Sequence, residues 1–183
     1  MKHSTVIVLG ISGVGKTTLC EAFVAKHKTF LHFSASKLLQ AATGCSPDRL
    51  RLLPKESIIK NQNLLGEALF QKMAGREGYN LIIDAHTIID NETGLVVVPI
   101  EPIASLNPKG FIFLHAAPEV LLQRRLTDNR KRPYRTATEL RKQQSIAKGI
   151  AYKYARALHK KINLIQSDKF EDFDDAVVNI AES

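Results

Sequence analysis

Residues 10–17 constrain the fold most strongly, because they read GISGVGKT and fit the pattern G-x-x-x-x-G-K-[S/T]. The apolar run 5–9 precedes them, and the amphipathic stretch 16–27 follows. In a loop of this kind, backbone N–H groups surround phosphate oxygens, and a Cβ would block their approach or forbid the φ angles required. The sequence therefore predicts a strand, a phosphate-binding loop and a helix in succession.

The loop residues are suited to a nucleoside triphosphate with Mg²⁺. Lys16 supplies a mobile positive charge for the β- and γ-phosphates, and Thr17 offers a hydroxyl to the metal. The helix N-terminus adds free N–H groups and the positive end of its dipole. We expect the triphosphate to be bound by Gly10, Ser12, Gly13, Val14, Gly15, Lys16, Thr17 and Thr18.

The rest of the chain alternates short apolar runs with amphipathic stretches. Strands are expected at 5–9, 30–33, 79–84, 110–115 and 162–166. Helices are expected at 16–27, from 34 or 36 to 42, at 55–73, 118–128, 136–160 and 168–182, with a loop at 43–54 and irregular chain at 85–108. This alternation predicts an α/β fold in which a five-stranded parallel sheet has helices on both faces.

Composition narrows the class of protein. The chain has 183 residues, 44% of them hydrophobic, which suits one domain with a proper core. Its two cysteines, Cys20 and Cys45, lie in no metal-binding spacing. No apolar run approaches the roughly 20 residues of a membrane span, and the N-terminus lacks the pattern of a signal peptide. We therefore expect a cytoplasmic protein that does not contact membranes.

Positive charge is concentrated in one part of the chain. The net charge is +8, yet residues 124–161 hold 13 of the 26 Lys and Arg against Asp128 and Glu139 alone. Such a block faces polyanions, either nucleic acid or the phosphates of a nucleotide.

An acidic residue follows the third expected strand. Asp84 ends the run LIID, so it should lie at the carboxyl edge of the sheet beside the phosphate-binding loop. There it can hold the waters of the metal. His86, two residues further on, either contacts the acceptor or stabilises a loop.

Five arginines and one lysine lie within residues 123–135, QRRLTDNRKRPYR. A solvated basic face is the usual meaning of such a run. Here amphipathic helices flank a short loop, and phosphoryl transfer requires both positive charge and exclusion of water. We therefore interpret this segment as a mobile lid.

Together these features resemble the archaeal type of adenylate kinase, within the P-loop nucleoside monophosphate kinase family, over nearly the whole chain. The small nuclear adenylate kinases of eukaryotes are similar more loosely. The resemblance depends on the phosphate-binding loop, Asp84-Ala85-His86, Arg124–Asp128 with Arg130 and Arg132, Thr136–Thr138, and Gln143–Gln144. Two positions depart from the family pattern: Arg135 stands at or near an acidic position, and Lys148 replaces an arginine.

The resemblance implies a division of the chain and roles for its residues. The sheet order should be 2-3-1-4-5, in a single domain 1–183 with a nucleoside-monophosphate-binding insert at about 34–75 and a lid at about 124–137. Arg125 should stack on adenine, the backbone of 167–169 should line its edge, and ATP and Mg²⁺ should be the cofactors. Catalysis should depend on Lys16, Arg130, Arg132 and Asp84, and metal binding on Thr17 and Asp84. The acceptor side should use Arg51, from the loop 46–53, and Lys148.

The residues themselves favour a phosphate acceptor. A hydroxyl acceptor needs a general base, usually a carboxylate, but residues 33–39 contain no Asp or Glu and Asp84 is assigned to the metal. A phosphate acceptor needs only positioning and neutralisation of charge. We therefore expect a nucleoside monophosphate, and by resemblance AMP, to be bound by Ser34, Lys37, Arg51, His86 and Lys148.

Two alternatives remain. One is a P-loop kinase of another small molecule that uses Asp84 or His86 as the base. The other is an RNA-associated ATPase that uses the basic helix 139–161. The cations of that helix do not all share one face, which favours a solvated surface over an RNA-binding one. The sequence carries no signal for oligomeric state.

Overall fold

The computed structural model describes residues 4–91, 93–128 and 132–183, and at 47 and 51 the backbone only. The predicted lid residue Arg130 and the side chain of the predicted acceptor residue Arg51 therefore lie outside the described part of the protein.

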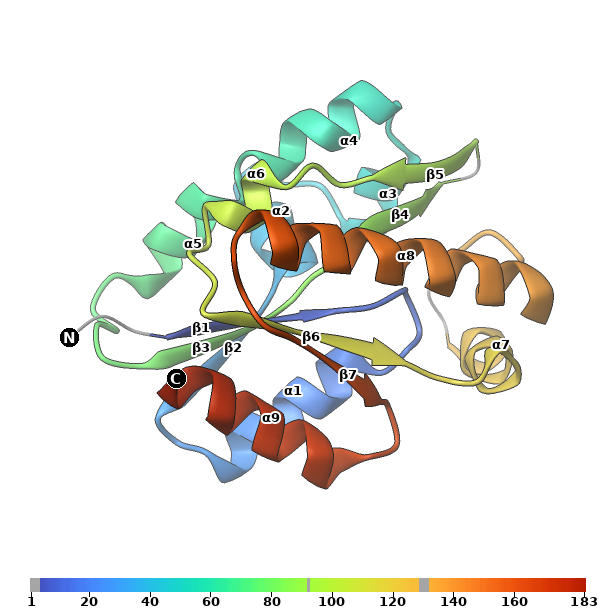
Figure 1. Ribbon diagram of the computed structural model, residues 1–183. Helices are drawn as coiled ribbons and strands as arrows, with labels where there is room; N and C mark the ends of the chain where they lie inside the picture. Colours follow the sequence, from blue (N-terminus) through green and yellow to red (C-terminus); the bar gives the residue numbers. More distant parts are fainter. Residues whose placement is uncertain (1–3, 92, 129–131) are drawn as a thin grey trace.

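Five parallel strands form the central sheet, in the order β2-β3-β1-β6-β7 (Figure 1). All five lie where the apolar runs predicted them. Their bounds are Thr5–Leu9 for β1, Phe30–Ser34 for β2, Asn80–Asp84 for β3, Gly110–His115 for β6 and Ile162–Gln166 for β7. Every residue of β1 is buried, as expected of the central strand in a sheet covered on both faces.

The predicted strand order 2-3-1-4-5 is corrected, because two further strands lie between β3 and β6. β4 (Ile88–Asn91) and β5 (Gly94–Val97) pair antiparallel and make a separate two-stranded sheet. Residues 85–108 were expected to be irregular. Each of these strands is only four residues long, and the prolines at 99, 102 and 108 obscured the two apolar runs on either side of DNETG.

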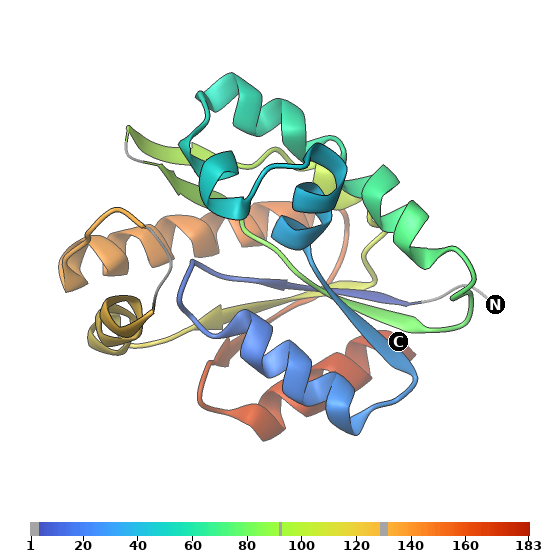
Figure 2. The ribbon, with the colours of Figure 1, turned by 180° about the vertical axis from the view of Figure 1, so that it is seen from behind.

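Helices cover both faces of the sheet (Figures 1 and 2). α1 and α9 pack side by side beneath one face, and α8 crosses the other. The bounds are Lys16–Lys26 for α1, Ala35–Thr43 for α2, Pro47–Leu52 for α3, Lys55–Gln62 for α4, Leu65–Met73 for α5, Glu101–Ala104 for α6, Pro118–Thr127 for α7, Ala137–Ala157 for α8 and Phe170–Glu182 for α9.

Aromatic and ionic contacts join α1 to its neighbours. The Phe23 ring meets Phe30 and Phe173 edge to face, at centroid distances of 5.0 and 6.3 Å. Beside them, Asp174 accepts hydrogen bonds from Lys26 at 2.9 Å and from His27 at 2.8 Å. These contacts anchor the C-terminal end of α1 to β2 and α9, which helps to fix the position of the N-terminal end at the phosphate-binding loop.

Two helical predictions are corrected. The predicted single helix 55–73 is two helices, because the amides of Asn63 and Leu64 bond three residues back rather than four. The predicted loop 43–54 contains α3, whose N-cap Ser46 accepts a hydrogen bond from the amide of Arg49 at 3.3 Å. Ser-Pro-Asp is a helix-start signal that sequence analysis passed over.

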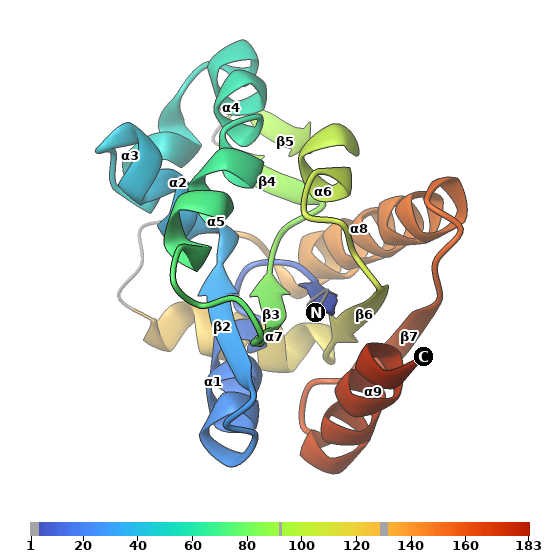
Figure 3. The same ribbon diagram turned by 90° about the vertical axis from the view of Figure 1, so that its left-hand side faces the viewer.

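The segments above the carboxyl edge of the sheet shape the site. Helices α2 to α5 and the β4–β5 hairpin stand together on one side, as the end-on view shows (Figure 3). α8 begins with the predicted capping box of Thr136 and Glu139. The amide of Gln144 bonds both the N–H and the carbonyl of Ala116, each at 3.0 Å, which ties α8 to the end of β6.

Across the described ranges, no helix has the length and apolar character needed to cross a membrane.

Candidate active site

The loop between β1 and α1 has the backbone that its glycines predicted. Gly13 and Gly15 have φ angles of 90° and 103°, which residues with a Cβ rarely adopt. A Cβ on Gly10 would lie 2.8 Å from the carbonyl oxygen of Leu114. The glycines therefore set the curvature of the loop and let it pack against β6.

Lys16 points into the loop rather than into solvent, and only 5% of it is exposed. Its Nζ donates to the carbonyl of Gly10 at 2.8 Å and to that of Ile11 at 3.2 Å. The Nδ1 of His86 lies 3.4 Å from the same Nζ and 3.1 Å from the Gly10 oxygen. The loop and the segment after β3 thus hold the ammonium group from two sides.

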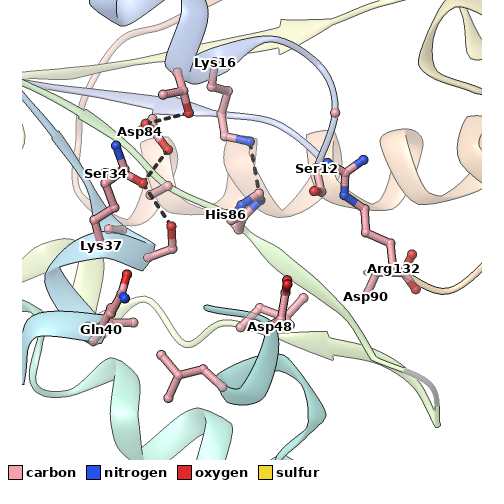
Figure 4. A pocket seen from close by; sticks show the side chains of 18 of the residues that line it. Ser12, Lys16, Ser34, Lys37, Gln40, Asp48, Asp84, His86, Asp90 and Arg132 are labelled. Atoms are coloured by element: carbon pink, nitrogen blue, oxygen red, sulfur yellow. Dashed lines mark hydrogen bonds between the residues drawn. The ribbon is translucent and has the colours of Figure 1, made fainter. Parts of the chain in front are cut away.

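Asp84 lies at the centre of a polar network at the end of β3 (Figure 4). Thr17 Oγ1 and His32 Nε2 lie 3.2 and 2.8 Å from its Oδ2, and Ser34 Oγ lies 3.2 Å from its Oδ1. Burial opposes ionisation, but the hydrogen bond from His32 and the charge of Lys16 outweigh it, so the pKa of Asp84 is below its ordinary value. The carboxylate is therefore ionised at neutral pH.

The oxygen atoms at this point suit Mg²⁺. That ion keeps several waters and takes one or two protein oxygens beside substrate phosphates. The Thr17 hydroxyl and the Asp84 carboxylate provide two such oxygens, 3.2 Å apart, at the start of α1. The residues predicted to hold the metal therefore fit it.

A pocket of about 670 Å³ opens from the phosphate-binding loop and extends toward α2, α4 and α5. One end is formed by the loop and by arginines of α7. The other end is formed by Ser34, Lys37, Gln40, Asp48, Asn61, Gln62 and the apolar side chains Leu39, Leu50, Ile58, Leu65 and Ile103. The side chains labelled in Figure 4 converge on this space from both ends.

Arginines from the end of α7 reach the loop. Arg124 donates to the carbonyl of Val14 at 2.8 Å and to Ser167 Oγ at 2.9 Å. Arg125 Nε donates to the carbonyl of Ser12 at 3.0 Å. Guanidinium groups of α7 thus bond two carbonyls of the loop, those of Ser12 and Val14.

Arg132, which lies in the predicted lid shortly before α8, also reaches the phosphate-binding loop. Its Nη1 lies 3.5 Å from where a Cβ of Gly13 would be. Its side chain is 5% exposed and forms an ion pair with Asp128. Within the described residues, its Nε and Nη1 are buried without a hydrogen-bond partner. Such atoms beside a phosphate-binding loop suit an anionic ligand.

Most of the described site residues that the sequence predicted meet in this pocket. The lining includes Ser12, Gly13, Gly15, Lys16, Thr17, Thr18, Ser34, Lys37, Asp84, His86, Arg125 and Arg132. Gly10 and Val14 are buried within the loop and do not line the pocket. Lys148 does not join them, because its side chain is exposed on α8 and does not line the pocket.

Four residues that hold the site together were not predicted as site residues: His32, Asp90, Arg124 and Ser167. His32 and Asp90 lie on β2 and β4, and nothing in the local pattern distinguishes them from ordinary strand residues. Arg124 was grouped with the lid cations, whereas it bonds the loop and Ser167. Ser167 was predicted only as backbone near the adenine.

Comparison with known proteins agrees with this geometry. A family model described as an AAA domain matches residues 9–141, from the end of β1 into α8. The adenylate kinase of Pyrococcus abyssi is 27% identical, over 97% of this chain and 93% of its own length. That of Methanopyrus kandleri is 25% identical, over 91% and 92%.

Solved structures share the fold. A shikimate kinase from Acinetobacter baumannii, in complex with shikimate, matches with a TM-score of 0.66 at 15% identity, over 97% of this chain and 94% of that one. A shikimate kinase from Bacteroides thetaiotaomicron matches with a TM-score of 0.56 at 17% identity, over 98% and 99%. These structural likenesses show the fold alone. The family match over residues 9–141 shows that the chain belongs to the AAA domain family, and with the adenylate kinase relatives it identifies a P-loop kinase.

Proposed function

We propose that this kinase transfers the γ-phosphoryl group of MgATP to a nucleoside monophosphate, and that the acceptor is AMP, so that ATP and AMP give two ADP. The observation that carries the proposal is the pocket itself. It joins a phosphate-binding loop to a second region, which is lined by Ser34, Lys37 and amide and apolar side chains.

The carboxylates around the pocket support a phosphate acceptor. Asp84 accepts three hydrogen bonds, Asp90 is paired with two arginines, and Asp128 is paired with Arg132. A general base must reach the proton that it takes. The oxygens of these three carboxylates are already engaged by hydrogen bonds or arginines, so they are poorly placed to take a proton from a hydroxyl group. Asp48 also lines the pocket. If the acceptor were an alcohol, Asp48 would be the candidate base, so its substitution distinguishes the two classes of acceptor.

The geometry suggests how transfer proceeds. The loop amides and Lys16 hold the β- and γ-phosphates, and Thr17 with Asp84 would hold Mg²⁺, which neutralises phosphate charge when bound. The monophosphate of the acceptor approaches beside Lys37 and needs no deprotonation. Arg132, beside Gly13, stabilises the charge on the transferred group. The insert 34–75 and the lid 124–137 are the parts we assign to acceptor binding and to exclusion of water.

The adenylate kinases to which the chain is similar from end to end support AMP as acceptor. An assay of ADP release from MgATP with AMP, CMP, GMP, UMP, shikimate or no acceptor tests the proposal. We expect the highest kcat/KM with AMP. A rate with AMP no higher than the rate without acceptor would refute it, and a high rate with shikimate would identify a hydroxyl acceptor.

A further inference from the structure

One carboxylate, that of Asp90, bonds two arginines on either side of the connection between α7 and α8. Its Oδ2 lies 3.3 Å from Nη1 of Arg125, in the last turn of α7. Its Oδ1 accepts from Nη2 and Nε of Arg135 at 3.0 and 3.2 Å, just before α8 begins. Two residues ten positions apart in the chain therefore meet on one side chain of the β4–β5 hairpin.

These charges are largely removed from solvent. The side chains of Asp90 and Arg125 are 9% and 7% exposed, and that of Arg135 is 21% exposed. Ion pairs at this depth differ from surface pairs, because removing one partner leaves the other charge poorly solvated. The contact is therefore a fixed feature of the pocket wall, to which both Asp90 and Arg125 belong.

Arg125 is held from two directions. Asp90 contacts its terminal nitrogen, while its Nε donates to the carbonyl of Ser12 at 3.0 Å. Its Cγ lies 3.1 Å from where a Cβ of Gly13 would be, so its stem lies directly against the loop. A guanidinium is planar, and contacts at two of its nitrogens define the orientation of that plane.

We propose that Asp90 is a positioning residue, which orients Arg125 over the phosphate-binding loop and, through Arg135, ties the start of α8 to the same point. The inference rests on the proposed function only in requiring that the loop bind a nucleotide. Asp90 acts on the nucleotide through Arg125. The β4–β5 hairpin, which sequence analysis treated as irregular chain, thus acquires a role in nucleotide binding.

The first test measures ADP binding by calorimetry. Asp90→Asn keeps the shape of the side chain and removes its charge, and we expect the Kd for ADP to rise about fivefold or more. In an Arg125→Ala background the same substitution should cause no further loss, because residues that act as a unit are not additive. Glu119→Gln is the matched control, since Glu119 pairs with Arg141 at 3.8 Å in an exposed contact.

A tighter or unchanged Kd in Asp90→Asn would overturn the inference, as would equal losses with and without Arg125. An unchanged value would mean that the charge of Asp90 has no effect on nucleotide binding, and a tighter value would mean that Asp90 acts only as a negative charge repelling phosphate. Asp90→Glu, which restores the charge on a longer side chain, should recover part of the affinity.

The second test needs no nucleotide. We expect amide hydrogen exchange of residues 124–128 and 132–137 to be faster in Asp90→Asn than in wild type, with β1 and β6 unchanged as internal references. Exchange no faster than in Glu119→Gln would refute the inference. If the wild type binds ADP but does not phosphorylate AMP, the proposed acceptor is wrong while both tests of Asp90 still apply.

Discussion

Thr17 Oγ1 lies 3.2 Å from Oδ2 of Asp84, and this hydrogen bond joins the start of α1 to the end of β3. The two residues are 67 positions apart, and the parallel register that places Val8 opposite Asp84 brings them together. An oxygen pair at the mouth of a phosphate-binding loop is the arrangement on which the proposed metal site depends.

Removing the hydroxyl of Thr17 tests that metal site. Thr17→Val keeps the volume of the side chain, and we expect kcat/KM with MgATP to fall about 100-fold, whereas Thr17→Ser keeps the oxygen and should retain most activity. The measurement is a Mg²⁺ titration of the transfer rate for each variant. Equal activity in the valine and serine variants would exclude Thr17 as a metal ligand.

Arg132 is expected to stabilise the charge on the transferred phosphoryl group. Arg132→Ala should lower kcat about 100-fold or more, and Arg132→Lys should recover little, because an ammonium lacks the planar fork of a guanidinium. Arg141→Ala, at an exposed arginine of α8, is the control and should be neutral. A kcat near that of wild type in Arg132→Ala would remove this residue from the mechanism.

Asp48 distinguishes the two classes of acceptor. If the acceptor is a phosphate, Asp48→Asn should change kcat less than about tenfold, because no proton must be removed. If it is an alcohol and Asp48 is the base, the loss should be about 10² to 10⁴-fold. Steady-state kinetics at saturating acceptor decides between them, and the larger loss would contradict a phosphate acceptor.

The pH dependence of stability tests the contacts of Asp174 with α1. Burial opposes ionisation of this carboxyl, but hydrogen bonds from Lys26 and His27 outweigh it, so its pKa lies below the ordinary value. A lowered pKa stabilises the fold above the unfolded-state pKa of about 3.9, and that stability is lost as pH falls through the folded-state pKa.

We therefore expect Asp174→Asn to reduce the free energy of unfolding by about 1–2 kcal/mol at pH 7. The difference from wild type should shrink as the pH is lowered below about 4. Urea unfolding at pH 7 and pH 3 measures both values. A difference that is equal at the two pH values would show that the charge of Asp174 contributes nothing.

The sequence was informative wherever one local pattern determined one structure. The five sheet strands were predictable because runs such as TVIVL and GFIFLH are apolar at nearly every position, which is typical of strands in a sheet covered on both faces. The phosphate-binding loop was predictable because its glycines leave few alternatives. The proximity of Thr17 and Asp84 was predictable because Asp84 ends the strand LIID beside the loop, whereas their role as metal ligands stays a prediction.

The remainder depended on contacts between distant segments. Asp90 became part of the pocket wall only because the hairpin carries it to Arg125 and Arg135, 35 and 45 positions away. In the sequence, His32 cannot be distinguished from an ordinary strand residue. It contacts Asp84 because β2 pairs in parallel with β3. Lys148 was assigned to the acceptor side from resemblance alone, and in the structure its side chain is exposed on α8 and does not line the pocket, so that role stays a prediction.

The most direct test of the central claim follows the γ-phosphoryl group itself. MgATP labelled with ³²P at the γ position is incubated with AMP and the protein, and the products are separated, with Lys16→Ala as the inactive control. We expect the label to appear in ADP at a rate that depends on AMP, and this transfer to be lost in Lys16→Ala. Label found only in inorganic phosphate, or in a product formed without AMP, would contradict it.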